Sequence, residues 1–446
     1  MQGGQLKKHR PLRASRQFKL GRQQPELDFV DVDVRGDVRL FVDPRALRLV
    51  RSPWGDECVA LLQDFFRSVL RAIRDGHFDT AQRMLEALRE PNETHLGFSR
   101  GRPRGRALGE QSAADVAQAL AQSEAAKTGL VEDLEDTALL VPGISIDIVS
   151  DIATNIIREP LIRYTQHACE TYGIPTRPGI AAGPLWDPTQ RDWFQGWADL
   201  PVAGGQRLLL VPKSIVRRRL DYDEDEYYGL YILDELRTRE LDSNSELVRT
   251  LKSGERIVTK RDLQKKYGSG KHVIIRETRN QPELLDDYRE FKERNPLRPL
   301  NHAQLHNETH AGLPEWEKLL EAVVSLPPGA ATASEYHGAV EKILTALFYP
   351  SLAYPHIEAP LHGGRKRIDI TYTNLAITGF FGYLANHYPC ANIFVECKNY
   401  SADPGNPELD QLSSRFSPSR GQVGLLVCRR IANRDLFMKR CRDTAP

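Results

Sequence analysis

The chain lacks the cysteine pairs and long apolar runs that are typical of extracellular or membrane proteins. Its 446 residues include six widely spaced cysteines with no CxxC pair, which indicates free thiols in a reducing compartment rather than disulfides or structural zinc. No apolar run approaches the roughly 20 residues needed to span a bilayer. The start, MQGGQLKKHR, has no apolar core of a secretory signal. We therefore expect a cytoplasmic protein that does not enter a membrane.

An excess of one charge is also lacking over the chain as a whole. The formal net charge is +1, with 40% hydrophobic and 27% charged residues, which is a soluble globular composition with no general preference for a polyanion. The exception is the start, where residues 1–22 contain no acid and these basic residues: Lys7, Lys8, Arg10, Arg13, Arg16, Lys19 and Arg22. We expect residues 1–25 to form a disordered basic tail, which either contacts nucleic acid or stays solvated.

The length allows two or three domains. Residues 26–300 carry several helical patterns, including 56–73 and 144–172, the second of which Pro160 should kink or divide. We expect a larger, mostly helical α+β domain there, which recognises substrate, binds a protein partner or a second copy of the chain, or gates activity.

The segment 301–314 predicts a linker, because asparagine, histidine, glycine and proline recur in it. Three histidines at intervals of four residues, His302, His306 and His310, would share one face if this segment were helical. A zinc site is conceivable there, but the position in a predicted linker argues against it.

Residues 315–446 show a different pattern, in which apolar strands alternate with helices. The predicted order is a helix over 333–348, a strand in 363–374, an insert over 375–391, a strand over 392–400, a helix over 407–416 and a strand over 423–428. This order is typical of a mixed α/β domain.

Two neighbouring strands of this region present an unusual set of charged residues. Glu396 and Lys398 are two residues apart on an otherwise apolar strand, so their side chains project from the same face. Asp369 lies between two isoleucines in the preceding strand and can face the same side. Carboxylates, together with the carbonyl of Cys397, are the oxygen ligands that Mg²⁺ prefers, and a lysine ammonium can stabilise charge at an attacked phosphate.

Asp369 followed by Glu396-Cys397-Lys398, between a leading helix and a trailing helix–strand unit, resembles the PD-(D/E)XK nuclease superfamily. The string VECKNY (395–400) is similar to its restriction-type, Mrr-like branch. The resemblance covers 315–446 and implies a restriction-endonuclease-like mixed sheet flanked by helices. It implies that Asp369, Glu396 and the Cys397 carbonyl bind Mg²⁺, with Mn²⁺ as an alternative, and that Lys398 positions the water or stabilises the transition state.

The resemblance also implies a glutamate on the leading helix, for which Glu341 is preferred over Glu335. His337 lies one turn before Glu341 and is a candidate to line the site. On the trailing helix, Gln411 and Arg415 match auxiliary positions that contact substrate. Two further candidates for phosphate contacts come from the basic residues around the acidic centre: Arg367, just before Asp369, and Arg420, in the SPSRG turn.

The sequence therefore predicts a metal-dependent nuclease that hydrolyses DNA phosphodiester bonds, with a possible role in bacterial restriction or anti-phage defence. DNA rather than RNA follows from the resemblance alone. The competing prediction is a catalytically inactive nuclease fold that binds nucleic acid or serves as a scaffold in a defence complex.

Overall fold

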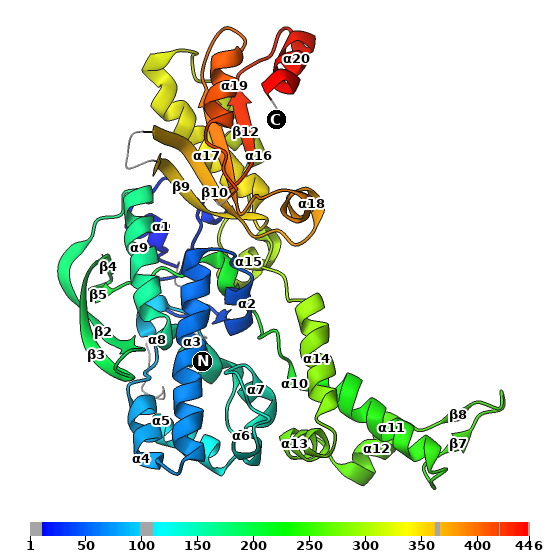
Figure 1. Cartoon of the computed structure of the whole chain (residues 1–446). Helices are drawn as coiled ribbons and strands as arrows, with labels where there is room; N and C mark the ends of the chain where they lie inside the picture. Colours follow the sequence, from blue (N-terminus) through cyan, green and yellow to red (C-terminus); the bar gives the residue numbers. More distant parts are fainter. Residues whose placement is uncertain (1–10, 99–109, 362–365, 419, 445–446) are drawn as a thin grey trace, which may run out of the picture.

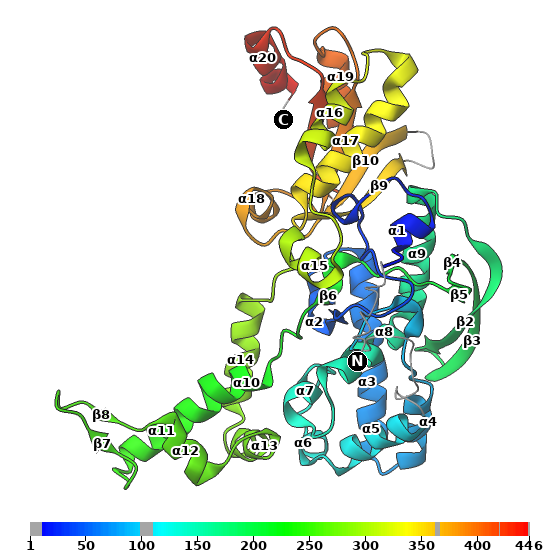
Figure 2. The ribbon, with the colours of Figure 1, turned by 180° about the vertical axis from the view of Figure 1, so that it is seen from behind.

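A computed structural model describes residues 11–98, 110–361, 366–418 and 420–444 of the chain. It is a mixed α/β structure with a helical N-terminal unit, a helical arm and a C-terminal unit built on a four-stranded sheet. Figure 1 shows the C-terminal unit above the N-terminal unit and the arm extending to one side, and Figure 2 shows the same arrangement from behind. Within the described ranges, no helix combines the length and apolar character needed to cross a bilayer.

The N-terminal unit is organised around one long helix, α3, which Ser52 caps by accepting a hydrogen bond from the Gly55 N–H. One face of α3 is buried in the main core, and the polar face is exposed. The helices of this unit are α1 (Ala14–Gln17), α2 (Pro44–Arg48), α3 (Pro53–Arg74), α4 (Phe78–Glu86), α5 (Glu110–Gln122), α6 (Glu124–Thr128), α7 (Asp136–Leu140), α8 (Ile146–Ile156) and α9 (Arg158–Tyr172).

The predicted long helix over 144–172 is divided into α8 and α9 at Ile157. Pro160 lies in the first turn of α9, where backbone N–H groups have no partner within the helix, so a proline removes no hydrogen bond there. The prediction that this proline divides the segment is therefore confirmed, although the break precedes it by three residues.

The strands of the N-terminal unit pair locally, and the longest pair is the antiparallel hairpin β2–β3. Their bounds are β1 (Phe41–Val42), β2 (Arg177–Asp187), β3 (Asp192–Leu200), β4 (Val202–Ala203), β5 (Gln206–Arg207) and β6 (Val216–Arg217). The hairpin lies along α3, α8 and α9 (Figure 1), and its residues Trp186 and Trp193 pack edge-on against Phe65 of α3.

The arm connects the two units and consists of helices with one short hairpin. Its elements are α10 (Glu224–Tyr227), α11 (Leu233–Asp242), β7 (Arg249–Thr250), β8 (Arg256–Ile257), α12 (Lys260–Tyr267), α13 (Lys271–Asn280) and α14 (Glu283–Arg294). A π-helical turn over Tyr228–Ile232 joins α10 to α11.

The C-terminal unit contains a sheet with the strand order β12-β11-β10-β9, in which β11 and β12 are parallel and the other pairs are antiparallel. One face packs on α17 through Val340 and Leu344, and the other packs on α19 through Leu412. The elements are α16 (Trp316–Val324), α17 (Ala333–Phe348), β9 (Leu352–Leu361), β10 (Lys366–Asn374), α18 (Gly379–His387), β11 (Asn392–Lys398), α19 (Asn406–Ser413), β12 (Val423–Cys428) and α20 (Arg434–Thr444).

The junction between the two units is a buried polar network rather than an open linker. The carboxylate of Asp28 accepts hydrogen bonds from the Tyr164 hydroxyl and from the backbone N–H of Tyr354, each at 2.9 Å. The Tyr354 hydroxyl lies 2.9 Å from the Ser214 hydroxyl, and Tyr349 is part of the main core of the N-terminal unit. The edge of the C-terminal sheet is therefore anchored in the N-terminal unit.

Two predictions about irregular segments are wrong. The predicted tail over 1–25 is folded from residue 11 onward, because Arg13 and Ser15 are buried and hydrogen-bond to residue 31; residues 1–10 lie outside the described part. The predicted linker contains α15 (His302–Thr309), which begins with a capping box between Asn301 and Gln304.

Candidate active site

Glu396 and Lys398 project from the same face of β11, as their spacing predicts. Lys398 Nζ lies 3.4 Å from Glu396 Oε2, and both side chains are buried beneath α19. The Gln411 side chain joins them, because its Nε2 donates to Glu396 Oε2 at 3.2 Å and its Oε1 accepts from Lys398 Nζ at 3.0 Å. Arg415, just past the end of α19, lies 3.4 Å from Glu396 Oε1 through its Nε. The predicted strand pair and the predicted trailing residues therefore meet at one point.

Asp369 reaches the same end of the sheet from β10. Ile370 pairs with Val395 in the antiparallel register. The next pair along the two strands is Asp369 and Glu396, which therefore lie opposite each other. Asp369 Oδ2 accepts a hydrogen bond of 2.7 Å from the backbone N–H of Cys397. The N–H and C=O of one strand residue point toward the same neighbouring strand, so the Cys397 carbonyl is also directed to the side of Asp369.

His337 completes the approach to Asp369 from α17. Its Nε2 lies 3.8 Å from Asp369 Oδ2, and its ring is about a quarter exposed. The prediction that His337 lines the site agrees with this geometry. Asn399, which no sequence motif marks as part of the site, donates hydrogen bonds from its side chain to Pro327 O, Gly329 O and the Thr332 hydroxyl. It thereby ties the end of β11 to the segment that leads into α17, and its position directly after Lys398 is the only sequence signal for it.

The electrostatics of the cluster are dominated by the buried carboxylate of Glu396. Burial raises its pKa, and the neighbouring charge of Asp369 raises it further, whereas Lys398 and Arg415 act in the opposite direction. Two acids and two cations are therefore close together at the end of one strand pair. Burial without such partners would strongly disfavour the charged form of Glu396.

The carboxylate and carbonyl oxygens here are of the type that a hard divalent cation prefers. Mg²⁺ is commonly held by one or two carboxylates and completes its shell with water and phosphate oxygens, so Asp369, Glu396 and the Cys397 carbonyl would suffice. Among the described residues, no group of three or more His, Cys, Asp and Glu side chains is arranged to hold a metal ion. A metal at this position would therefore depend on the backbone carbonyl and on oxygens from outside the protein.

Glu341 does not join the cluster. Its carboxylate is fully buried and lies 2.6 Å from Arg22 Nη1, at the junction with the N-terminal unit. Its other oxygen accepts a hydrogen bond of 3.0 Å from the Thr345 hydroxyl. Glu335, the alternative, is exposed in the first turn of α17. The preference for Glu341 as a catalytic residue is therefore not supported, because Arg22 occupies its carboxylate.

The two basic candidates for phosphate contacts have different positions. The Arg420 carbonyl accepts a hydrogen bond from the Asn392 side chain at 2.9 Å, at the first residue of β11. Asn392 precedes Glu396 by four residues, about 13 Å along the strand at roughly 3.3 Å per residue, and Arg420 Nε donates to the Ser417 hydroxyl at 3.1 Å. The structure does not bring Arg420 into the cluster. The side chain of Arg367 lies outside the described part of the chain.

Comparison with known proteins bears on the N-terminal unit. A family model described as a domain of unknown function (DUF8370) matches residues 19–223. That range runs from the last part of the predicted tail to the start of the arm, and it excludes the sheet that holds Asp369 and Glu396. No curated protein and no solved structure matches the chain.

Proposed function

We propose that residues 315–446 form a nuclease domain of the restriction-endonuclease-like fold that hydrolyses phosphodiester bonds in DNA with Mg²⁺ or Mn²⁺. The observation that carries the proposal is the meeting of Asp369 with the Glu396–Lys398 pair at the end of two adjacent strands. The four-stranded mixed sheet with α17 and α19 on opposite faces agrees with the fold that the sequence resemblance implies.

The residues of the cluster would have distinct tasks. Asp369, Glu396 and the Cys397 carbonyl would hold the metal, which neutralises phosphate charge and activates water when it is bound. The Lys398 ammonium, held by Gln411, would stabilise the charge that develops on the attacked phosphate. Arg415 opposes the rise in the pKa of Glu396 that burial and Asp369 cause, and it would be a second cation for the phosphate backbone. A role in restriction or anti-phage defence is part of the proposal only through the resemblance.

The test is cleavage of plasmid, linear and single-stranded DNA by the full chain, with Mg²⁺, Mn²⁺ or EDTA. Cleavage should require the metal, and Lys398→Met should slow it by about a hundredfold or more, which is typical for the loss of one stabilising group. Lys439→Met on α20 is the matched control, because Lys439 is exposed and lies outside the cluster. Circular dichroism should show that both variants are folded. Wild-type rates in a folded Lys398→Met variant would refute the assignment.

The second candidate function is binding without catalysis. It is favoured by one observation: both oxygens of Glu396 already face cations of the protein itself. If the wild-type chain binds DNA with equal affinity in Mg²⁺, Mn²⁺ and EDTA but cleaves neither DNA nor RNA, this alternative replaces the nuclease proposal.

A further inference from the structure

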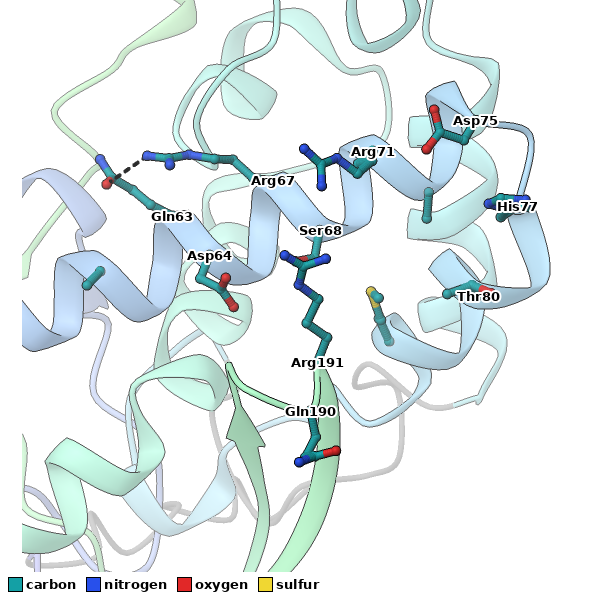
Figure 3. Close-up of a pocket in the computed structure, with 13 residues that line it drawn as sticks. Gln63, Asp64, Arg67, Ser68, Arg71, Asp75, His77, Thr80, Gln190 and Arg191 are labelled. Carbon is teal, nitrogen blue, oxygen red and sulfur yellow. Dashed lines mark hydrogen bonds between the residues drawn. The ribbon is translucent and has the colours of Figure 1, made fainter.

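A cavity of about 680 Å³ with many polar lining residues lies in the N-terminal unit. It is bounded by α3, by the start of α4 and by the turn that joins β2 to β3 (Figure 3). All of its lining residues belong to the segment matched by the family model, 19–223, and none belongs to the C-terminal sheet. Its volume is in the range of small-molecule sites, which is about 300 to 1,000 Å³.

The α3 wall of the cavity is the polar face of that helix. Arg67 and Arg71 are four residues apart and share this face, whereas the apolar face of α3 is buried in the core. The Arg67 Nη2 donates a hydrogen bond of 3.0 Å to Gln63 Oε1, and both arginine side chains are exposed. The helix therefore presents two guanidinium groups to the cavity.

The opposite wall contributes a third guanidinium. Arg191 lies at the tip of the β2–β3 hairpin, and Figure 3 shows its side chain extending toward Ser68 on α3. Its φ is 51°, a left-handed conformation that residues other than glycine rarely adopt. The turn is fixed by Asp187, whose Oδ1 accepts from the N–H groups of Thr189 and Gln190. Backbone strain of this kind is commonly retained where it aims a functional side chain.

The cavity lining holds three arginines, Arg67, Arg71 and Arg191, against two carboxylates, Asp64 and Asp75. In the described part of the chain, the side chains of Arg71 and Arg191 have no hydrogen-bond or ion-pair partner, and Arg67 has only the neutral Gln63. Asp64 accepts a hydrogen bond of 3.0 Å from the Trp186 indole N–H, so this carboxylate is held in place beside the arginines. Three cations around a concave surface would be satisfied by a ligand that carries more than one negative charge.

We propose that this cavity binds a small phosphorylated molecule of the nucleoside phosphate class. Arg71 and Arg191 would hold the phosphate groups from opposite walls, with Arg67 beside them. Asp64 would accept a hydrogen bond from a hydroxyl or amino group of the same ligand. The proposal concerns the N-terminal unit and does not depend on nuclease activity.

The test is isothermal titration calorimetry of the full chain with pyrophosphate, ATP and citrate at constant ionic strength, without divalent metal. Wild-type protein should bind pyrophosphate and ATP saturably, and ATP more tightly, because only ATP offers hydroxyl and amino groups to Asp64. Arg71→Gln should weaken binding by about tenfold or more. Arg191→Gly should also weaken binding, while its unfolding midpoint stays equal to or above that of wild type, because glycine relieves the left-handed strain.

The matched control is Arg51→Gln, because Arg51 is exposed and precedes the other end of α3. It should bind both phosphate probes as wild type does. The proposal is overturned if neither phosphate probe binds saturably, or if Arg71→Gln and Arg191→Gly bind as tightly as wild type. An equal loss of affinity in Arg51→Gln would show that binding depends on the overall positive charge rather than on this cavity, and it would also contradict the proposal. Binding of citrate alone, or of a single-stranded oligonucleotide when both small probes fail, would also contradict it.

Discussion

The buried ion pair between Arg22 and Glu341 offers the sharpest test of how the two units are joined. The Glu341 side chain is 0% exposed and that of Arg22 is 10% exposed, with 2.6 Å between Arg22 Nη1 and Glu341 Oε2. Replacing Arg22 by methionine leaves the carboxylate buried with one remaining partner, the Thr345 hydroxyl. Removing one partner of a buried pair costs about 3 to 5 kcal/mol, so we expect Arg22→Met to lower the free energy of unfolding by that amount.

The double variant Arg22→Met/Glu341→Gln should recover most of this loss, since neither buried charge remains and the glutamine still accepts from Thr345. Arg163→Met is the control, because Arg163 and Glu57 form an ion pair that is 42% and 44% exposed, and such a pair contributes less than about 1 kcal/mol. The assay is guanidinium chloride unfolding followed by circular dichroism.

A DNA cleavage assay adds a second measurement to the same variants. If Glu341 anchors the units and takes no part in chemistry, Glu341→Gln should cleave at the wild-type rate per folded molecule. The reasoning fails if Arg22→Met unfolds at the wild-type midpoint, or if the double variant is no more stable than the single one. A hundredfold loss of cleavage in folded Glu341→Gln would instead restore Glu341 as a catalytic candidate.

Two further predictions concern the same junction, where the Lys213 carbonyl accepts a hydrogen bond of 3.3 Å from the Tyr349 hydroxyl. Burial lowers the pKa of Lys213 from 10.5 to about 8, so between these pH values the unfolded chain holds a proton that the folded chain has released, and stability should rise with pH. The unfolding midpoint of wild type should therefore rise relative to that of Lys213→Met from pH 8 to 10.5, and parallel curves would contradict this. Tyr164→Phe removes the hydroxyl that donates to the buried carboxylate of Asp28 at 2.9 Å. This substitution should lower the free energy of unfolding in urea by about 2 kcal/mol, which is typical for the loss of a hydrogen bond to a charged group. An unchanged midpoint would show that this bond contributes nothing to stability.

The elements of the C-terminal sheet could be predicted because local pattern determines them. The helix predicted over 333–348 matches the bounds of α17, and the strand over 423–428 matches β12. The insert over 375–391 contains α18. The edge strand β9 was not predicted. Tyr349 precedes this strand and Tyr354 lies within it, and both face the core of the N-terminal unit, so they break the alternation of a half-buried strand.

The site was predictable to the extent that strand geometry alone fixes it. A spacing of two residues placed Glu396 and Lys398 together whatever the rest of the fold, and the antiparallel register brought Asp369 opposite them. The helix glutamate was not predictable in this way. Helical periodicity identifies a buried face but not its neighbour, and the partner of Glu341 is Arg22, which lies more than three hundred positions earlier in the chain.

The predicted linker shows the limit of composition as a signal. Asparagine, histidine and proline suggested an open segment, yet Asn301 and Gln304 satisfy both conditions of a capping box and begin α15. His302 and His306 lie in α15, whereas His310 follows it as the C-cap residue with a left-handed φ of 55°. His302 Nε2 lies 2.8 Å from Ala346 O, and His306 Nδ1 contacts Ala311 O. The His302 imidazole therefore joins α15 to the end of α17, and the His306 imidazole bonds within its own segment.

The boundary near residue 315 separates two sequence patterns but does not separate two independent packing units. The helix that carries His337 also carries Glu341, which Arg22 holds from the N-terminal side. The strand next to β10 begins beside Tyr354, whose backbone N–H is bound by Asp28. These contacts anchor α17 one turn beyond His337, and they anchor β9 at Tyr354. Tyr354 lies near the end of β10 that is remote from Asp369, because Ala353 pairs with Thr373 and Ala359 pairs with Ile368. Because Arg22 and Asp28 both belong to the segment matched by the family model, that segment holds the helix that packs against β10 and the strand that pairs with it.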